Sequence, residues 1–335
     1  MSRKIVFAGN ILVDNVKTVA FWPEKGMLVP ITGVRRAVGG SVCNTGIDLK
    51  TLDPSVEVAA LGKVGSDEAG DFAVEVMTAK GVDCSQVTRV GDAPTSFTDV
   101  MTVEGTGERT FFNMHAADSR LTPDDVDPSE LGCDIFHLGY LLLLDGLDAP
   151  DADYGTQAAR LLAKVQAAGI RTSIDLVSVR SDRFARIVRP ALKYCDYLVV
   201  NEIEGSLATG IPSGGSDGRT SPEALAKIAS ELLRLGVKRK VVLHCPEMSV
   251  CCEAGGATEV LPSLSLPDGW IKGAVGAGDA FCSGMLYSFL ADMTSVDGMR
   301  LASCAAAANL SVPDSVSGAL PLEATLALDR RFRRG

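Results

Sequence analysis

The sequence predicts an α/β fold with a mainly parallel central sheet covered by helices on both faces. Strand-like apolar runs alternate with amphipathic helical stretches over most of the 335 residues, which is the pattern of a parallel sheet with crossover helices. Hydrophobic residues make up 46% of the chain, enough to bury a large core. A hairpin pattern interrupts the alternation, which predicts a second, smaller sheet.

The N-terminal third predicts the first strand–helix repeats. Apolar residues spaced three or four apart predict a helix that Ser41 can cap. Scattered apolar residues and turn formers before residue 38 predict only turns and short strands. The predicted elements are a strand over 4–9, a helix from Ser41 to about residue 53, a strand over 56–61 and a helix over 67–80 that Gly81 closes.

The hairpin pattern lies between Thr95 and Met114, around a turn at 104–107. Together with the short strands before residue 38, we expect it to form a small sheet that stands off the main domain. The predicted organisation is one domain over residues 1–335, with a lid formed by segments at about 10–38 and 94–115.

From residue 133 onward the alternation is regular. The predicted elements are a strand over 133–139, a helix over 154–168, a strand over 171–176, a helix over 182–194, a strand over 196–200, a helix over 222–235, a strand over 239–245, and helices near 278–291 and 296–312. A flexible loop over 213–221 precedes the helix that Pro222 begins. The basic end at 330–334 is predicted to be a solvated helix terminus.

Composition excludes several classes of function. Lys and Arg total 32 against 42 Asp and Glu, a net charge of −10, which disfavours a nucleic-acid partner. The apolar run at 135–144 is too short for the roughly 18 to 20 residues of a membrane span. The N-terminus lacks a signal-peptide pattern, so we expect a cytoplasmic protein without membrane contact. Nine cysteines without a C-x-x-C pair predict buried thiols.

The sharpest local motif is a Gly-rich turn, 273–278, that opens a helix. The free backbone N–H groups of such a turn suit an anion such as a phosphoryl group, and Asp279 would face the same point. A carboxylate there makes chemical sense if it accepts a proton from an attacking hydroxyl. The pattern alone equally allows a tight loop with a stabilising acid in the first helical turn.

Two further motifs suit polar ligands. Gly39 and Gly40 open the helix that carries Asn44, and Asp14 follows the first strand. A glycine pair lets a polyhydroxylated ligand approach the backbone, and amide and carboxylate groups bind hydroxyls. Each residue is also a common turn or cap residue.

Asn201 and Glu204 follow the strand over 196–200, at the sheet edge where ligands bind in parallel folds. Their oxygens suit a hydrated Mg²⁺ on nucleotide phosphates. The alternative is a helix start with acidic residues in its first turn. Asp175 ends another strand and is a candidate of the same positional kind.

These motifs occur in the order Asp14, Gly39-Gly40 with Asn44, Asn201 with Glu204, and Gly276-Ala277-Gly278-Asp279. The combination resembles the ribokinase-like (PfkB) carbohydrate kinase family over nearly the whole chain, and the C-terminal G-A-G-D-x-F fingerprint is quite specific. The resemblance implies a three-layer ribokinase-like sandwich with a small β-sheet lid. It also implies MgATP-dependent phosphorylation of a hydroxymethyl group on a sugar or nucleoside.

The resemblance also implies roles for individual residues. Asp279 is the base, Gly276, Ala277 and Gly278 are the anion hole, Asn201 and Glu204 match the N-x-x-E motif for Mg²⁺ and phosphates, and Asp14, Gly39, Gly40 and Asn44 match substrate-binding positions. The hairpin adds Arg109, which suits an anionic group on the substrate or donor, or is an exposed charge. Asn113 and His115 are expected to point towards the substrate cleft.

The chain departs from the family pattern at two places. Gly273 and Ala274 stand where the family has Asp-Thr, which leaves a requirement for a monovalent cation open. His244 begins a His-Cys-Pro sequence in place of a Thr-x-Gly turn that helps to hold nucleotide, and Pro246 has no N–H to donate. ATP is the expected donor, with ADP or another nucleotide as the alternative.

Two other classes stay open from the sequence. A non-catalytic sugar or nucleotide sensor on the same fold fits the altered nucleotide motifs, although a pure binder has no need for Asp279 beside an anion. A Rossmann-type dehydrogenase would have the same kind of sheet, but this chain has no early G-x-G-x-x-G motif and no suitable acid about 20 residues beyond one. We also expect a homodimer through the lid, because a lid sheet with an exposed apolar face needs covering.

Overall fold

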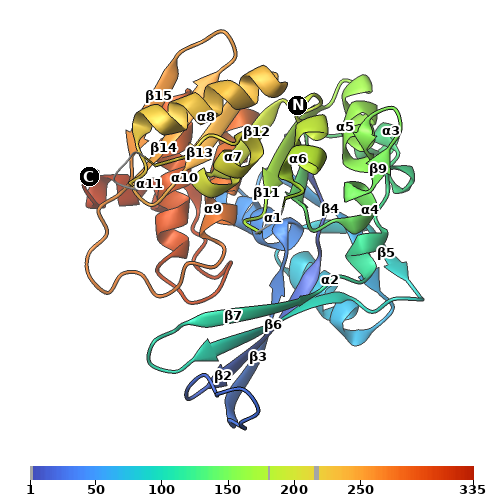
Figure 1. Cartoon of the computed structure of the whole chain (residues 1–335), viewed down its shortest axis with the longest axis vertical. Coiled ribbons are helices and arrows are strands. Elements are labelled where there is room, and N and C mark those ends of the chain that lie inside the picture. Colours follow the sequence, from blue (N-terminus) through green and yellow to red (C-terminus); the bar gives the residue numbers. More distant parts are fainter. Residues whose placement is uncertain (1–2, 180–181, 215–218) are drawn as a thin grey trace.

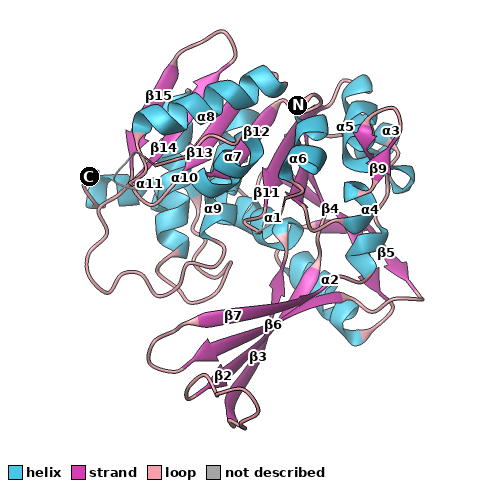
Figure 2. Ribbon diagram, in the orientation of Figure 1, coloured by secondary structure: helices cyan, strands magenta, loops and turns pink. Residues whose placement is uncertain are grey.

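The main body of the protein is a nine-stranded sheet. The computed structural model describes residues 3–179, 182–214 and 219–335. The strand order is β15 (Thr258–Pro262), β14 (Met248–Glu253), β13 (Lys240–His244), β12 (Tyr197–Asn201), β11 (Arg171–Leu176), β8 (Ile135–Leu141), β1 (Lys4–Ala8), β4 (Glu57–Gly65) and β5 (Asp83–Val90). The strands from β13 to β5 are parallel, whereas β14 and β15 add in antiparallel fashion at one edge. The predicted fold class is confirmed (Figure 2).

Helices cover both faces of this sheet. One layer contains α1 (Ser41–Leu52), α2 (Glu68–Ala79), α9 (Ala277–Leu290) and α10 (Ser295–Asn309), and the other contains α5 (Gln157–Ala167), α6 (Phe184–Leu192), α7 (Glu202–Thr209) and α8 (Pro222–Leu235). In β12, Leu198 and Val200 pack into the second layer, whereas Tyr197 and Val199 pack into the first. Because both faces are buried, such strands are apolar throughout, which made them easy to predict.

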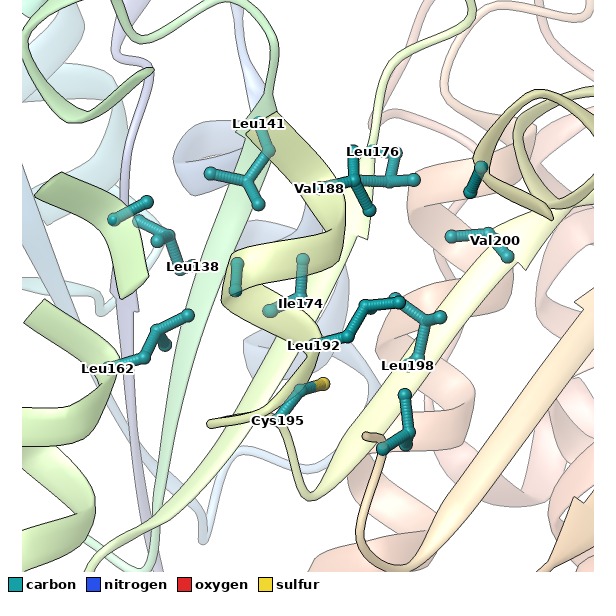
Figure 3. Close-up of a cluster of buried hydrophobic side chains, with 14 of the residues drawn as sticks. Leu138, Leu141, Leu162, Ile174, Leu176, Val188, Leu192, Cys195, Leu198 and Val200 are labelled. Carbon is teal, nitrogen blue, oxygen red and sulfur yellow. The ribbon is translucent and has the colours of Figure 1, made fainter. Parts of the chain in front are cut away.

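Figure 3 shows the packing beneath α6. Leu138, Ile174 and Leu198 come from three neighbouring strands, and Val188 and Leu192 of α6 lie against them. All five side chains are fully buried. Each burial of this kind stabilises the fold by roughly 1.5 to 3 kcal/mol, so the packed core holds the middle of these strands in place.

A second sheet of four strands projects from one end of the main body (Figure 1). Its order is β3 (Ile31–Gly39), β2 (Leu12–Val19), β6 (Ser96–Val103) and β7 (Arg109–Met114). The hairpin predicted between Thr95 and Met114 is confirmed as β6 and β7. The prediction of short strands before residue 38 is wrong, because β2 and β3 have eight and nine residues. Charged side chains occur on both faces of these strands and hide the alternation on which a strand prediction depends.

Other differences from the sequence predictions lie at edges and ends. The strands β5, β14 and β15 were not predicted; β5 is largely polar and partly exposed, so it has no apolar run. The helix expected over 154–168 begins only at Gln157, because β9 (Pro150–Asp151) and β10 (Gly155–Thr156) form a small hairpin before it. The remaining elements are η1 (Ala117–Arg120), η2 (Pro123–Asp125), α3 (Pro128–Leu131), α4 (Asp145–Asp148) and α11 (Leu322–Arg331). Part of the predicted loop at 213–221 lies outside the described residues.

The cysteine prediction is largely confirmed. All nine cysteines are free thiols, seven of them buried, and Cys84 and Cys133 are partly exposed. Within the described residues, no helix has the length and apolar character that a bilayer crossing requires.

Candidate active site

The Gly-rich turn lies at the N-terminus of α9, and Asp279 lies in the first turn of that helix. Gly276 caps the helix with a φ of 81°. A Cβ at this position would lie 2.5 Å from the carbonyl oxygen of Ser315, so the turn requires glycine. Ala277 and Gly278 follow at the positive end of the helix dipole, where an anion is favoured.

Asp279 is buried and is held by two side chains from distant elements. The Nδ2 of Asn44 on α1 donates to Oδ2 at 2.9 Å, and the hydroxyl of Tyr140 on β8 donates to both carboxylate oxygens at 2.9 Å. Burial, followed by the nearby charge of Asp175, raises the pKa of Asp279 to about 7 despite these hydrogen bonds. A carboxylate with this pKa can take up a proton near neutral pH.

Sequence reasoning missed Tyr140. Its φ of 56° lies in the left-handed region, which is uncommon for a bulky residue. Its backbone N–H donates to Oδ1 of Asp175 at 2.5 Å, so Tyr140 contacts both carboxylates. The only signal in the sequence is its place near the carboxyl end of a buried strand, the edge at which ligands bind.

A cavity of about 410 Å³, hereafter the central cavity, contains Asp279. Asp175, Asn201, Glu204 and His244 also line it. These four residues lie at or just after the carboxyl ends of β11, β12 and β13, so the predicted sheet edge brings them together. The central cavity therefore combines carboxylates with an anion-favouring helix end.

Asn201 and Glu204 cap α7 and also face the central cavity. The Asn201 side chain accepts hydrogen bonds from the N–H groups of Ile203 and Glu204, and Oε2 of Glu204 accepts from the N–H of Asn201 at 3.0 Å. Ser178 donates to Oε1 at 2.8 Å. Burial, with a further contribution from Asp175, raises the pKa of Glu204 to about 8. The predicted helix start and the predicted ligand position are thus the same residues.

A larger cavity of about 540 Å³, hereafter the apolar cavity, adjoins the central one and shares Asn201, His244 and Gly278 with it. Its walls include Met248, Leu264, Leu266, Ile271, Phe281 and Leu310. The ring of His244 packs against Phe281 with centroids 4.5 Å apart. Burial lowers the pKa of His244 to about 4, so the imidazole is neutral at pH 7. The two cavities together suit a ligand with a flat apolar part and a charged part.

A third and much smaller cavity of about 20 Å³, hereafter the small-sheet cavity, lies between the small sheet and residues 313–315. Asp14, Arg35, Arg109 and Phe111 line it, and Phe111 also lines the central cavity. Burial raises the pKa of Asp14 to about 6, although a hydrogen bond from Thr98 and the charges of both arginines oppose this rise. Polar acceptors and donors therefore meet on the side of Asp279 that faces the small sheet.

The remaining predicted residues lie close to these cavities. Gly39 packs on Asp14, because a Cβ there would lie 2.7 Å from Oδ2. Gly40 has a φ of 87° and caps α1. Asn113 donates to Oγ1 of Thr98 at 3.0 Å and so reaches Asp14 only through that hydroxyl. His115 does not line these cavities; its ring contacts the carbonyl of Leu143 at 3.0 Å.

Comparisons with known proteins agree with this geometry. The family described as pfkB family carbohydrate kinase matches residues 2–321. The probable fructokinase-7 of Arabidopsis thaliana is 29% identical over 301 residues, which are 87% of this chain and 80% of that protein. The solved structure of Arabidopsis thaliana ribokinase complexed with ribose and ATP has a TM-score of 0.81 at 20% identity and covers 98% of this chain and 99% of its own. A putative ribokinase II from E. coli in complex with ATP and Mg²⁺ has a TM-score of 0.77 at 19% identity, covering 99% and 100%. The chain belongs to the pfkB family of carbohydrate kinases.

Proposed function

We propose that this carbohydrate kinase transfers a phosphoryl group from MgATP to a hydroxymethyl group of a sugar or nucleoside, with Asp279 as the general base. One observation carries the proposal. Asp279, with a pKa of about 7, lies at the N-terminus of α9 in a cavity that connects an apolar slot to a polar one. A base and an anion site at the same point are what phosphoryl transfer to a hydroxyl requires.

The three cavities offer a place for each reactant. The apolar cavity suits the base of the nucleotide, and Asn201 and His244 lie where that cavity meets the central one, in reach of phosphates. The acceptor would lie in the central cavity beside Asp279, on the side next to the small-sheet cavity, where Asp14 and Asn44 would bind its hydroxyls. The small sheet, from segments at about 10–38 and 94–115, acts as a lid over that acceptor. The structurally similar Arabidopsis ribokinase is complexed with ribose and ATP, which supports a site for one sugar and one nucleotide in this fold.

In the chemical step, Asp279 takes the proton of the attacking hydroxyl of the acceptor. The hydroxyl oxygen bonds to the transferred phosphorus, and the bond between that phosphorus and the leaving oxygen of the donor breaks. The N–H groups of Gly276, Ala277 and Gly278 form the anion hole that stabilises the charge on the transferred group. Asn44 holds the carboxylate in place through its hydrogen bond of 2.9 Å. These residues work without rearrangement because the helix end is already formed.

Glu204 fits a role in holding Mg²⁺. It lines the central cavity together with Asp175 and Asp279, and its pKa of about 8 shows that burial and neighbouring charge oppose its ionisation. A divalent cation nearby would favour the ionised carboxylates. When bound, Mg²⁺ neutralises charge on the donor phosphates.

An ADP-release assay with MgATP and a panel of pentoses, hexoses, keto-sugar acids and nucleosides tests the proposal. We expect a substrate-dependent signal that Asp279→Asn reduces by about 10³-fold, with substrate binding retained in calorimetry. Near-normal turnover in that variant would refute the assignment of the base. Sugar or nucleotide binding without any ADP release would favour the alternative, a non-catalytic sensor on the same fold.

We also propose a homodimer through the outer patch of the small sheet, defined as Trp22, Val34, Phe112 and Met114. Val34 and Phe112 are 72% and 52% exposed, and the rings of Trp22 and Phe112 stack with centroids 6.3 Å apart. Val34 is opposite Lys17 and Phe112 is opposite Asp99, so the Lys17–Asp99 ion pair lies between these apolar residues. A face that combines apolar side chains with an ion pair suits a second copy of the same patch about a two-fold axis. The cytoplasmic location and the lack of a nucleic-acid partner stay predictions from the sequence.

A further inference from the structure

Asp48 is a buried acid of α1 that the proposed chemistry leaves without a role. It is 3% exposed. Among the residues that the structure describes, no group donates a hydrogen bond to either of its carboxylate oxygens, and the charges that act on it are negative. A buried carboxylate with neither a donor nor a counter-charge is strongly unfavourable. Asp48 is therefore stable in the core only as a neutral group or with a bound cation.

Two further unpartnered atoms belong to the same helix. Oδ1 of Asn44 and Oγ1 of Thr45 are also buried and have no hydrogen-bond partner within the described part of the chain. Asn44 and Thr45 precede Asp48 by four and three residues. Side chains of a helix lean towards its N-terminus, and residues at these spacings have Cβ atoms about 5 to 6 Å apart. The unpartnered atoms of the three residues therefore form one cluster.

The hydrogen bond between Asn44 and Asp279 determines what this cluster lacks. Nδ2 of Asn44 donates to Asp279, so Oδ1 is left as an acceptor that needs a donor. An ionised Asp48 has no proton to donate, whereas a neutral carboxylic acid has one. The hydroxyl of Thr45 is itself a donor, to the other oxygen of Asp48 or to Asp279. A single proton on Asp48 thus provides partners for the whole cluster.

The charges around Asp48 favour the neutral acid. Burial, followed by the charges of Asp279 on α9 and Asp314 after α10, raises the pKa of Asp48 well above its ordinary value. A cation is a poorer solution, because hard cations such as Ca²⁺ take about six or more oxygens and the cluster offers four. Within the described residues, the acidic, His and Cys side chains grouped closely enough to share a metal ion do not include Asp48.

We propose that Asp48 is a positioning residue, which as the neutral acid donates a hydrogen bond to Oδ1 of Asn44 and so holds the amide that orients Asp279. The inference rests on the proposed function, since it assigns a support to the general base of that site. Asp48 itself contacts none of the reacting atoms. It acts only through the amide of Asn44.

Asp48→Asn and Asp48→Ala test the proposal through kcat and the pH profile of kcat/KM. Asparagine keeps a neutral donor of similar size, so kcat should stay within about threefold of the wild type and the acid limb should not move. Alanine removes the donor and should lower kcat by about tenfold. Its acid limb should move to higher pH, because the bond from Asn44 lowers the pKa of Asp279. A merely structural role would change stability and leave the acid limb in place.

A double-mutant cycle identifies Asn44 as the intermediary. In an Asn44→Ala background, Asp48→Ala should cause no further loss of kcat. Thr51→Ala is the matched control on the same helix, since the Thr51 hydroxyl donates to the carbonyl of Ile47 at 2.8 Å and has no contact with Asn44. It should leave kcat and the acid limb unchanged. Additive losses in the cycle would overturn the proposed contact.

Carbon-13 NMR of protein labelled at the aspartate carboxyls gives a readout that needs no acceptor. We expect one carboxyl to be protonated at pH 7 in the wild type and its signal to be missing in Asp48→Asn. An ionised Asp48 at that pH would overturn the inference, as would an acid limb that moves to lower pH in Asp48→Asn. A K⁺ requirement of the wild type that Asp48→Asn lacks would instead assign the carboxylate to a cation, and would also overturn it.

Failure of the proposed function is distinguishable from failure of this inference. Undiminished turnover in Asp279→Asn would refute the base and leave the protonation state of Asp48 in the NMR spectrum unaffected. Conversely, an ionised Asp48 with normal loss of turnover in Asp279→Asn would refute the positioning role and leave the kinase proposal standing.

Discussion

The hydroxyl of Tyr140 donates to both carboxylate oxygens of Asp279, at 2.9 Å each. The N–H of the same residue donates to Asp175, whose charge, after burial, raises the pKa of Asp279. A tyrosine with a φ of 56° stores backbone strain of about 1 to 3 kcal/mol. Tyr140 tolerates this strain because both of its donors meet carboxylates, and it thereby fixes the position of Asp279.

Tyr140→Phe should change the pH dependence of the reaction. The hydrogen bond from Tyr140 favours the ionised form of Asp279, so its loss raises the pKa of that group above about 7. The acid limb of the kcat/KM profile should move to higher pH by about one unit, with most activity recovered at pH 9. Tyr154→Phe, which alters a residue 38% exposed and outside the cavities, serves as the control. An unmoved acid limb would rule out this role for Tyr140.

Asp279→Asn should be more stable than the wild type at high pH. The pKa of Asp279 rises from 3.8 to about 7 on folding, so the folded protein binds the proton more tightly and loses stability as pH rises from about 4 to about 7. Asparagine does not titrate, and Glu204 and Asp14 are common to both proteins. Urea unfolding should therefore show the advantage of the variant growing by roughly 3 to 4 kcal/mol between pH 4 and pH 8. A pH-independent difference would contradict this account.

Gly276→Ala should cost both stability and turnover. The new Cβ would lie 2.5 Å from the carbonyl oxygen of Ser315, at a φ of 81°, so we expect a loss of roughly 2 to 4 kcal/mol in the free energy of unfolding. Gly255→Ala is the control, because Gly255 has a similar φ of 70° but nothing within 4 Å. It should cost only about 1 kcal/mol. Equal losses in the two variants would show that crowding at Ser315 is unimportant.

Ile271→Ala should weaken nucleotide binding and leave the acceptor unaffected. Ile271 lines the apolar cavity although it is 59% exposed, so a bound base would cover it. Removal of that contact should raise the KM for MgATP by about three- to tenfold, with the KM for the acceptor unchanged. Val260→Ala, at a residue 42% exposed and outside the cavity, should change neither value. A larger effect on the KM for the acceptor than on the KM for MgATP would show that the nucleotide binds in another cavity.

Phe112→Asp should convert the proposed dimer into a monomer. The substitution places a charge in the outer patch, where Phe112 stacks on Trp22, and desolvation of that charge opposes association. Sedimentation velocity should show one slower species. Val260→Asp, which places the same charge on a 42% exposed residue of β15 in the main sheet, should stay dimeric. A wild type that sediments as a monomer at all concentrations would refute the dimer itself.

The sequence alone was sufficient to predict the parallel sheet and the edge of it at which ligands are expected to bind. Val199 and Val200 are buried on opposite faces, so β12 is an uninterrupted apolar run, and Asn201 follows it directly. The succession of an apolar run and a polar residue lies within one short segment, so it can be recognised from the sequence alone. The Gly-rich turn before Asp279 is also a local signal, because the free N–H groups of a helix start follow from one segment, whereas the crowding of Gly276 by Ser315 does not.

The contacts of Arg35 and Tyr140 depend on pairing between distant segments and could not be predicted. Arg35 reaches the site only because β3 pairs with β2, and β2 pairs in parallel with β6. Tyr140 meets Asp279 across 139 residues of sequence. The hydrophobic periodicity within a segment does not show which distant residues that segment contacts. The charged residues of β2 and β3 additionally concealed the strands that carry them.

The connection between the small sheet and the main body should affect the rate at which ATP is hydrolysed in the absence of an acceptor. β3 ends at Gly39, and α1 begins at Ser41 and carries Asn44, which holds Asp279. Any rocking of the small sheet is thus transmitted through a single glycine, Gly40, to the group that orients the base. In the proposed arrangement the acceptor contacts Asp14 on β2 and so connects the small sheet to the site, whereas a water molecule in its place is too small to make this connection. We therefore expect hydrolysis of ATP without an acceptor to be slow, because no acceptor then fixes the small sheet and, through Gly40 and Asn44, the position of Asp279.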